Sequence, residues 1–222
     1  MSQFETLMAR DGHPFNAYIA NPTTAARGGI VILQEIFGLN AAVRGCVDSF
    51  AADGYLTVAP ALFDRIRRDI ELGYSAAEVE QAKGYAMQID QGKALLDITA
   101  AVAFARHAGK VAVIGYCWGG LLAWLMACAV PINAAVVYYG GRIGQHLART
   151  PMCPVMLHFG ERDTSIPREE IERIRTVFPS GIFHLYPAGH AFANGERPNN
   201  FNAEAAALAR QRTIAFLSTT IG

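Results

Sequence analysis

The stretch Gly115-Tyr116-Cys117-Trp118-Gly119 reveals most about the architecture of this chain. It follows the apolar run 111–114 and precedes a longer apolar run that starts at Gly120. A short β-branched run followed by a longer apolar one predicts a strand and then a helix, joined by a sharp turn. The flanking glycines permit such a turn, because a Cβ on either of them would clash. Cys117 is therefore expected at the top of the turn, exposed as a nucleophile.

Strand and helix patterns alternate along the rest of the chain. The predicted strands cover residues 4–9, 15–20, 30–33, 55–59, 111–115, 134–139, 155–159 and 182–186. The predicted helices cover residues 41–53, 93–107, 119–129, 169–178 and 203–217, and a capping box, Ser75-Ala76-Ala77-Glu78, begins another. This alternation predicts an α/β fold, in which helices cover both faces of a mostly parallel, twisted sheet. We expect residues 1–222 to form a single domain.

Two segments of this pattern carry more specific expectations. The helix 93–107 is amphipathic, and its stripe is predicted to consist of Leu96, Thr99, Ala100 and Ala103. The segment 64–73 is charged and irregular, which fits either a mobile flap or a solvated loop.

The composition excludes several classes of function. The 222 residues include 19 basic and 19 acidic side chains, so no net charge attracts nucleic acid or anionic lipid. The start lacks a secretory signal, and the longest apolar run, residues 121–132, is too short to span a membrane. The four cysteines show no Cys-x-x-Cys spacing, and three of them, Cys46, Cys128 and Cys153, have the apolar surroundings of small core residues. We expect a cytoplasmic protein with free thiols, no metal, no cofactor and no nucleic-acid or membrane partner.

Three residues could form a catalytic triad. Cys117, Asp163 and His190 each follow a predicted strand, and parallel strands place their carboxyl ends at one edge of the sheet, where ligands bind. Their order along the chain is that of α/β-hydrolases. His190 could take the thiol proton and later donate it to the leaving group, while Asp163 would hold the imidazole in the right tautomer. The alternative for each residue is structural: a core cysteine, a turn-capping aspartate or a core histidine.

The loop Gln34-Glu35-Ile36-Phe37-Gly38 also follows a predicted strand and adds two further groups. The backbone amides of Ile36 and Trp118 are the expected oxyanion hole. Glu35 would disfavour a thiolate beside it, because like charges repel in a low dielectric. We hypothesise that Glu35 keeps Cys117 as a neutral thiol at rest and receives its proton when substrate arrives. The alternative is that Glu35 caps the helix that follows the loop.

These motifs together resemble the dienelactone hydrolase family of α/β-hydrolases. The resemblance runs from about Asp11 to Leu217 and rests on Gln34-Glu35-Ile36-Phe37-Gly38-Leu39-Asn40, Gly115-Tyr116-Cys117-Trp118-Gly119-Gly120, Tyr138-Tyr139-Gly140, residues 160–163 and Gly189-His190-Ala191-Phe192. It implies an α/β-hydrolase fold without a separate lid, the Cys117–His190–Asp163 triad and hydrolysis of enol-lactones or related esters. It also implies a pocket lined by Phe37, Tyr85, Tyr139 and Phe192, each of which could instead belong to an ordinary aromatic core.

One position departs from the family pattern. Family members hold the carboxylate of the substrate with two arginines, and one of these lies four residues after the catalytic histidine, where this chain has Asn194. The other would lie in the helix that starts near Ser75, which contains no arginine. An asparagine cannot form a charge-assisted fork with a carboxylate. A neutral ester or lactone is therefore at least as good a candidate substrate as dienelactone, unless the role passes to Arg197, Arg65, Arg67 or Arg68.

The sequence thus predicts a cysteine-dependent hydrolase of small esters or lactones that acts through an acyl-thioester, as a monomer or a simple homodimer. Two other classes stay open. A small-molecule receptor on a hydrolase scaffold would bind its ligand saturably without releasing acid. A thiol redox sensor built on Cys117 would respond rapidly to peroxide, although Glu35 argues against it by disfavouring the thiolate.

Overall fold

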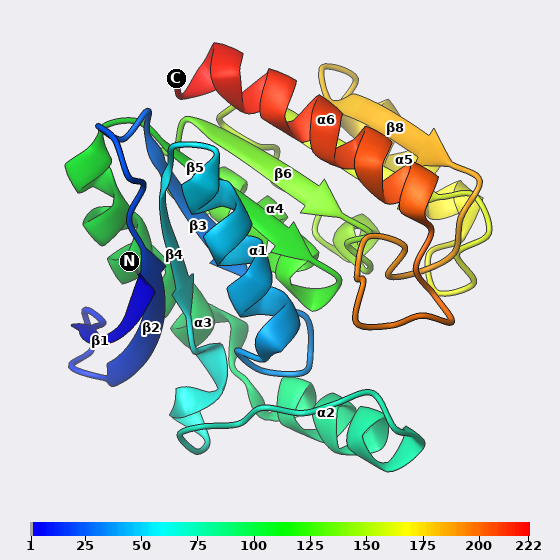
Figure 1. The fold of residues 1–222 in the computed structure, drawn as a ribbon. Coiled ribbons are helices and arrows are strands. Elements are labelled where there is room, and N and C mark those ends of the chain that lie inside the picture. The colour runs from blue at the N-terminus through cyan, green and yellow to red at the C-terminus, as the bar shows by residue number, and fades with distance from the viewer. Residues whose placement is uncertain (1) are drawn as a thin grey trace.

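The computed structural model describes residues 2–222, and within this range eight strands form one sheet in the order β1-β2-β4-β3-β5-β6-β7-β8 (Figure 1). The strands are β1 Ser2–Met8, β2 Pro14–Ala20, β3 Gly29–Leu33, β4 Leu56–Pro60, β5 Val111–Tyr116, β6 Ala134–Tyr138, β7 Val155–Gly160 and β8 Ile182–Tyr186. Neighbouring strands from β4 to β8 pair in parallel, whereas β1 and β2 form an antiparallel hairpin that extends the sheet beyond β4. Strands β3, β4 and β6 are buried along their whole length, because both faces of the sheet are covered.

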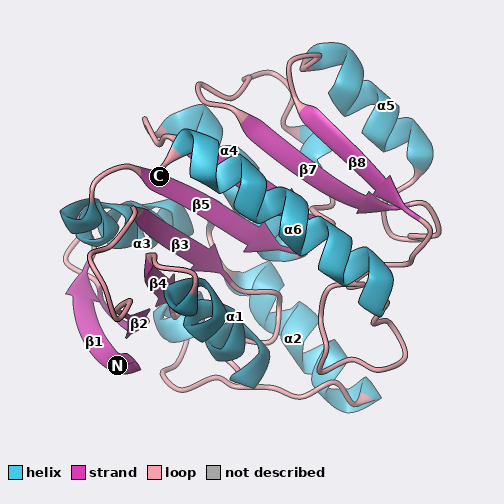
Figure 2. Ribbon diagram, turned by 45° about the horizontal axis from the view of Figure 1, so that its top comes forward, coloured by secondary structure: helices cyan, strands magenta, loops and turns pink. Residues whose placement is uncertain are grey.

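Helices cover the two faces of the sheet, as Figure 2 shows. They are α1 Ala41–Ala52, α2 Ala76–Gln88, α3 Gln91–Ala105, α4 Trp118–Ala129, α5 Arg168–Val177 and α6 Ala203–Thr220. α1 and α6 lie on the face turned to the viewer in Figure 1, and α3, α4 and α5 lie on the opposite face. α2 projects from one edge, and its predicted capping box is confirmed, because Ser75 and Glu78 each accept a hydrogen bond from the backbone amide of the other.

The predicted α/β-hydrolase architecture is confirmed, and no separate lid domain is evident in residues 2–222. Predicted and observed element ends differ by three residues at most, the largest difference being the end of α6, expected at residue 217 and found at Thr220. No helix in the described part of the chain combines the length and the apolar character needed to cross a membrane.

The predicted stripe of α3 is wrong. Thr99 and Ala103 are exposed, and Leu96 and Ala100 are only half-buried. The buried face instead consists of Ala94, Asp97, Ile98, Ala101, Val102 and Ala105. The error has a physical cause: Asp97 is fully buried on this face, and a charged residue interrupts the apolar period that the sequence would otherwise display.

The charged segment 64–73 is partly solvated, with Arg67, Arg68, Asp69 and Glu71 exposed, and is held to the rest of the fold by several contacts. Arg65, at the end of the short 3₁₀ helix Leu62–Arg65, donates two hydrogen bonds of 2.7 Å to Asp97 and two more to Asp11. Farther along, Ile70 is buried and the amide of Leu72 donates to the carbonyl of Phe37. These contacts hold the segment against α3, against Asp11 and against the loop that follows β3.

Candidate active site

Cys117 occupies a strained turn between β5 and α4. Its backbone has φ 53° and ψ −115°, a conformation that L-residues rarely adopt and that commonly marks functional sites. The two glycines around it are needed because their backbones touch other backbone atoms: a Cβ at Gly115 would overlap the carbonyl of Gly119, and one at Gly119 would overlap the carbonyl of Leu33. The turn therefore presents the Cys117 thiol at the carboxyl edge of the sheet.

The structure brings the three predicted triad residues into one chain of hydrogen bonds. His190, which follows β8, has its Nε2 atom 3.1 Å from the Sγ atom of Cys117 and its Nδ1 atom 2.7 Å from the Oδ2 atom of Asp163. Asp163, which follows β7, is 6% exposed, and its Oδ1 atom accepts a 2.8 Å hydrogen bond from the amide of Ser165. Because a carboxylate only accepts, His190 donates from Nδ1, and its Nε2 atom faces the sulfur of Cys117.

The surroundings of His190 make it a stronger base than an ordinary histidine. Burial disfavours the charged imidazolium, but the hydrogen bonds to Asp163 and Cys117 outweigh burial and raise the pKa of His190 to about 10. A nucleophile within reach of a base, with the base oriented by a carboxylate, is the arrangement that supports acyl transfer.

Glu35, directly after β3, is 5% exposed. Its Oε2 atom accepts a 2.8 Å hydrogen bond from the Nδ2 atom of Asn194, and its Oε1 atom has no partner among the described residues. Burial raises the pKa of the Glu35 carboxyl, although the hydrogen bond from Asn194 and the charges of Arg197 and His190 oppose the rise. The capping alternative is wrong, because the side chain of Asn40, not that of Glu35, accepts from the amide of Val43 at the start of α1.

The two amides expected to form the oxyanion hole belong to Ile36 and Trp118. Trp118 is the first residue of α4, so its amide is one of the unpaired amides at a helix N-terminus. Neither amide donates to a backbone carbonyl elsewhere in residues 2–222. Both amides therefore lack a backbone acceptor within the described residues, as the amides of an oxyanion hole must.

The four aromatic residues expected to line one pocket lie in different parts of the structure. Tyr139 lies beside the triad, with its ring centroid 5.1 Å from that of His190. Phe192 is fully buried behind Tyr139 and packs in the core. Phe37 is buried edge-on against Tyr74, a residue that the sequence interpretation missed. Tyr85, on α2, contacts Phe63, which in turn contacts Trp118.

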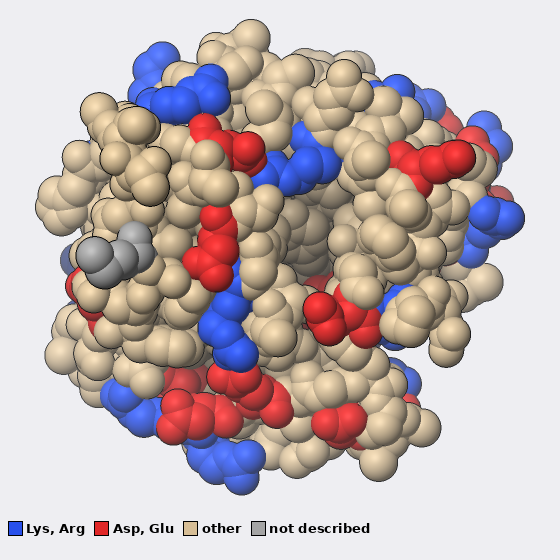
Figure 3. All heavy atoms as spheres, viewed as in Figure 1, with Lys and Arg blue, Asp and Glu red and all other residues tan. Residues whose placement is uncertain are grey.

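A cavity of about 190 Å³ opens next to these groups, between α1 and the loop 193–196. Of the predicted site residues it includes Glu35 and Tyr139, and Phe37, Tyr85 and Phe192 do not line it. Its remaining lining residues are Asn40, Ala41, Ala42, Val43, Gly45, Cys46, Tyr116, Ala193, Asn194, Gly195 and Glu196. Figure 3 shows a hollow in the middle of the face that carries α1. The small residues at the start of α1 were the sequence signal that could have indicated it.

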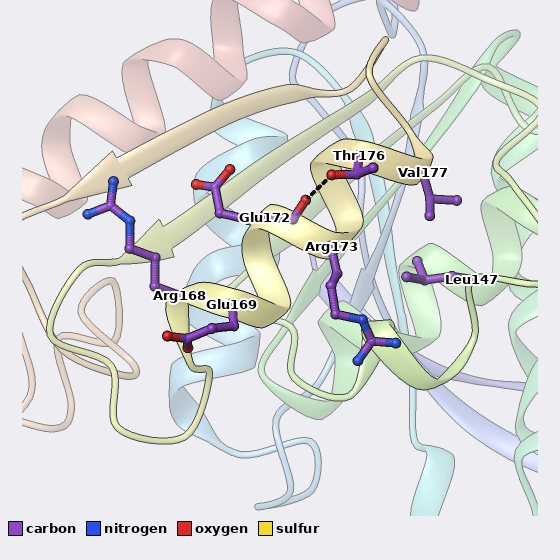
Figure 4. A pocket seen from close by; sticks show the side chains of 7 residues that line it. All are labelled: Leu147, Arg168, Glu169, Glu172, Arg173, Thr176 and Val177. Carbon is purple, nitrogen blue, oxygen red and sulfur yellow. Dashed lines mark hydrogen bonds between the residues drawn. The ribbon is translucent and has the colours of Figure 1, made fainter.

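A larger hollow, about 660 Å³, lies elsewhere on the surface. Figure 4 shows that α5 forms most of it, through Arg168, Glu169, Glu172, Arg173, Thr176 and Val177, with Leu147 opposite. It contains none of the triad residues. Size alone therefore does not select the candidate site, which is chosen here for the convergence of Cys117, His190 and Asp163.

The arginines proposed to replace the missing carboxylate clamp are placed differently by the fold. Arg65 is committed to Asp97 and Asp11, and Arg68 donates to Asn16. Arg197 lies near Glu35, with its guanidinium 5.4 Å from the ring centroids of both Phe37 and Tyr74. The amide of Asn194 is already engaged, because its Nδ2 atom donates to Glu35 and lies 3.1 Å from the hydroxyl of Tyr74.

Comparison with known proteins gives a consistent result. The sequence model of the "Dienelactone hydrolase family" matches residues 15–221. The chain is 35% identical to a carboxymethylenebutenolidase from Pseudomonas putida, covering 96% of this chain and 94% of that protein. It is 32% identical to carboxymethylenebutenolidase 1 from Cupriavidus pinatubonensis, over 96% and 94% of the two chains. The crystal structure of a candidate dienelactone hydrolase from Klebsiella pneumoniae superposes with a TM-score of 0.84 at 27% identity, covering 97% of each chain.

Proposed function

Because this chain belongs to the dienelactone hydrolase family, we propose that it hydrolyses small esters or lactones with Cys117 as its nucleophile. Hydrolysis of esters or lactones is the activity of the family and of the named relatives. The finer assignment rests on one observation, the hydrogen-bond chain of 3.1 Å and 2.7 Å from Cys117 through His190 to Asp163. The whole chain would act as one hydrolase domain.

In the acylation step, the thiolate of Cys117 attacks the carbonyl carbon of the substrate and forms a tetrahedral intermediate. The amides of Ile36 and Trp118 donate hydrogen bonds to its oxyanion. When the carbon–oxygen bond to the leaving group breaks, protonated His190 gives its proton to the departing oxygen. The raised pKa of His190 supports this role, because the imidazolium is the form that can donate.

In the deacylation step, His190, now neutral, removes a proton from water, and the resulting hydroxide attacks the acyl-thioester. The second tetrahedral intermediate collapses, expels the thiolate of Cys117 and releases the acid. In a lactone the leaving group stays tethered and can re-attack the thioester. An enol leaving group avoids this reversal by rearranging to a ketone, which would explain why a thiol nucleophile suffices.

Glu35 would control the protonation of Cys117. A buried carboxylate near the turn disfavours the thiolate and favours a neutral thiol in the resting enzyme. When substrate arrives, Glu35 takes the thiol proton, and it returns that proton after deacylation. Burial raises the pKa of the Glu35 carboxyl and so makes it a better acceptor for the proton.

The proposed substrate is a neutral ester or lactone. The position four residues after His190 carries the amide of Asn194, which is occupied by Glu35 and Tyr74. No guanidinium stands there to pair with a carboxylate. This preference distinguishes the chain from a hydrolase that depends on an anionic lactone.

The test is release of chromogenic leaving groups from esters and lactones, both anionic and neutral. Wild type should hydrolyse neutral substrates at least as fast as anionic ones. Cys117→Ala should lower kcat/KM by at least roughly a thousandfold, because it removes the nucleophile. Cys153→Ala is the matched control, since Cys153 is also a free, half-buried thiol but lies outside the triad. Full activity of Cys117→Ala would overturn the proposal.

A second measurement identifies the intermediate directly. Rapid quenching of wild type with a slow ester, followed by mass spectrometry of the Cys117 peptide, should show the mass of the acyl group. The Cys117→Ser variant should carry the acyl group as an oxygen ester if it retains activity. Acyl groups found on another residue instead would refute the assignment of Cys117.

A further inference from the structure

The cavity between α1 and the loop 193–196, here named the α1 cavity, is not explained by the triad. Its mouth is formed by exposed residues, among them Ala41, Gly45 and Gly195, so it opens to solvent. Its inner end is formed by Glu35 and Tyr139, which are 5% and 0% exposed. Since Tyr139 also contacts His190, the α1 cavity ends one side chain away from the catalytic histidine.

Two buried polar atoms lie close together at the inner end of the α1 cavity. The Oε1 atom of Glu35 and the hydroxyl oxygen of Tyr139 have no hydrogen bond of good geometry within residues 2–222, and Tyr139 is near enough to help lower the pKa of Glu35. Buried polar groups almost always make well-formed hydrogen bonds, so a hydroxyl group that bridges this pair would satisfy both atoms. The polar groups of the opposite wall need no further partner, because the Cys46 thiol and the Tyr116 hydroxyl lie 3.2 Å apart and form a hydrogen bond with each other.

The size and charge of the α1 cavity restrict what it can hold. Its volume of about 190 Å³ is that of about six water molecules at ~30 Å³ each. This is below the ~300 Å³ at which sites for drug-sized ligands begin. The lining includes Glu35 and Glu196 and no lysine or arginine, so a carboxylate would meet like charge. A hydroxyl group suits it, because one hydroxyl can both donate to and accept from these two buried oxygens.

We propose that the α1 cavity is a binding subsite for a small uncharged group that bears a hydroxyl, held between Glu35 and Tyr139. Small alcohols and diols belong to this class, and so does the hydroxyl-bearing part of a neutral ester. The inference deepens the proposed function by specifying part of the substrate, and it rests on that function only for the link to turnover. Binding can be measured without catalysis, which separates the two proposals.

Gly45 provides a clean way to fill the α1 cavity. It lines the cavity from α1, and a Cβ built on it meets no heavy atom within 4 Å. Gly45→Leu should therefore occupy cavity space without displacing protein. Gly84 is the matched control: it also lies within a helix, α2, an added Cβ there also meets nothing within 4 Å, and it does not line the cavity.

The experiment measures binding of propane-1,2-diol by ligand-observed NMR in the Cys117→Ala variant, which does not depend on turnover. Diol binding is expected in Cys117→Ala and in Cys117→Ala/Gly84→Leu, and should weaken by at least about tenfold in Cys117→Ala/Gly45→Leu. Propionate, similar in size but anionic, should bind at least about tenfold more weakly than the diol. Ala42→Leu, on the same wall, repeats the test if Gly45→Leu unfolds at a lower temperature than Gly84→Leu.

Three results would overturn the inference. The first is no detectable diol binding, the second is diol binding that neither filling variant weakens, and the third is propionate binding with the same affinity as the diol. None of them affects the assignment of Cys117, which depends on the acyl-enzyme and on the loss of activity in Cys117→Ala. Conversely, an active Cys117→Ala enzyme would refute the proposed nucleophile while leaving the diol measurement valid.

Discussion

Asn194 donates a 2.8 Å hydrogen bond to the Oε2 atom of Glu35, although the two residues lie 159 positions apart in the chain. The donor is a neutral amide, so Glu35 receives a hydrogen bond without an ion-pair partner in direct contact. Burial raises the pKa of Glu35, and the positive charges of Arg197 and His190 lower it by a smaller amount. Asn194 therefore has two proposed effects. It holds Glu35, which would control the protonation of Cys117, and it stands where an arginine would favour anionic substrates.

Replacing Asn194 with arginine should shift the substrate preference toward anions. A guanidinium at this position could pair with a substrate carboxylate through charge-assisted hydrogen bonds. We expect the ratio of kcat/KM for anionic over neutral lactones to rise by roughly tenfold in Asn194→Arg. Asn194→Gln, which keeps an uncharged amide, is the control and should leave the ratio near that of wild type. An unchanged ratio in Asn194→Arg would show that substrate carboxylates do not reach this position.

Removing the charge of Glu35 should make Cys117 more reactive at low pH. Burial raises the pKa of Glu35, and once the carboxyl ionises it disfavours the thiolate. Glu35→Gln removes that negative charge, so iodoacetamide should alkylate Cys117 faster than in wild type at the same low pH. The exposed Glu80 provides the control variant, Glu80→Gln. If the Glu35→Gln and wild-type profiles coincide, Glu35 has no part in controlling the thiol.

The protonation of His190 should stabilise the fold in a defined pH window. The folded-state pKa is raised to about 10 from an ordinary value of 6.5, so folding favours the protonated form. The resulting stabilisation is complete below pH 6.5 and is lost as the pH rises through about 10. The difference in free energy of unfolding between wild type and His190→Gln, measured with urea, should shrink across this window. A difference that stays constant from pH 6 to 10 would contradict the raised pKa.

Breaking the buried contact of Arg65 should destabilise the fold. Asp97 has no exposed side-chain surface and pairs with Arg65, so Asp97→Ala leaves a guanidinium without its buried partner. We expect a loss of about 3 kcal/mol in the free energy of unfolding. Asp11→Ala removes the other partner of Arg65, an exposed carboxylate, and should cost much less. Equal losses in the two variants would argue against burial as the cause.

The elements of the sheet and the shared location of Cys117, His190 and Asp163 were predictable because local patterns specify them. Glycines around Cys117 permit one kind of turn, and apolar runs of strand length end just before Asp163 and His190. Parallel strands then bring their carboxyl ends to one edge, so residues far apart in the chain acquire a shared location. The 3.1 Å and 2.7 Å contacts agree with that expectation.

Other features depend on which side chains meet, and no local pattern encodes that. The buried face of α3 contains Asp97, whose charge is tolerated only because Arg65 reaches it from another segment. Tyr74 has no motif, yet its hydroxyl lies 3.1 Å from the amides of Asn40 and Asn194. Phe37 and Phe192 resemble pocket residues in sequence, and only packing decides that Phe37 is buried against Tyr74 and Phe192 against Tyr139.

Chain order and periodicity therefore specify the fold and the sulfur–imidazole–carboxylate centre, because both follow from turn chemistry and strand direction. The surroundings of Glu35 and the shape of the α1 cavity arise from contacts between segments separated by more than a hundred residues. Such contacts depend on the exact packing of α1 against the loop 193–196. Substrate preference is expected to lie in these surroundings, and for that reason it could be proposed only once the folded chain was in view.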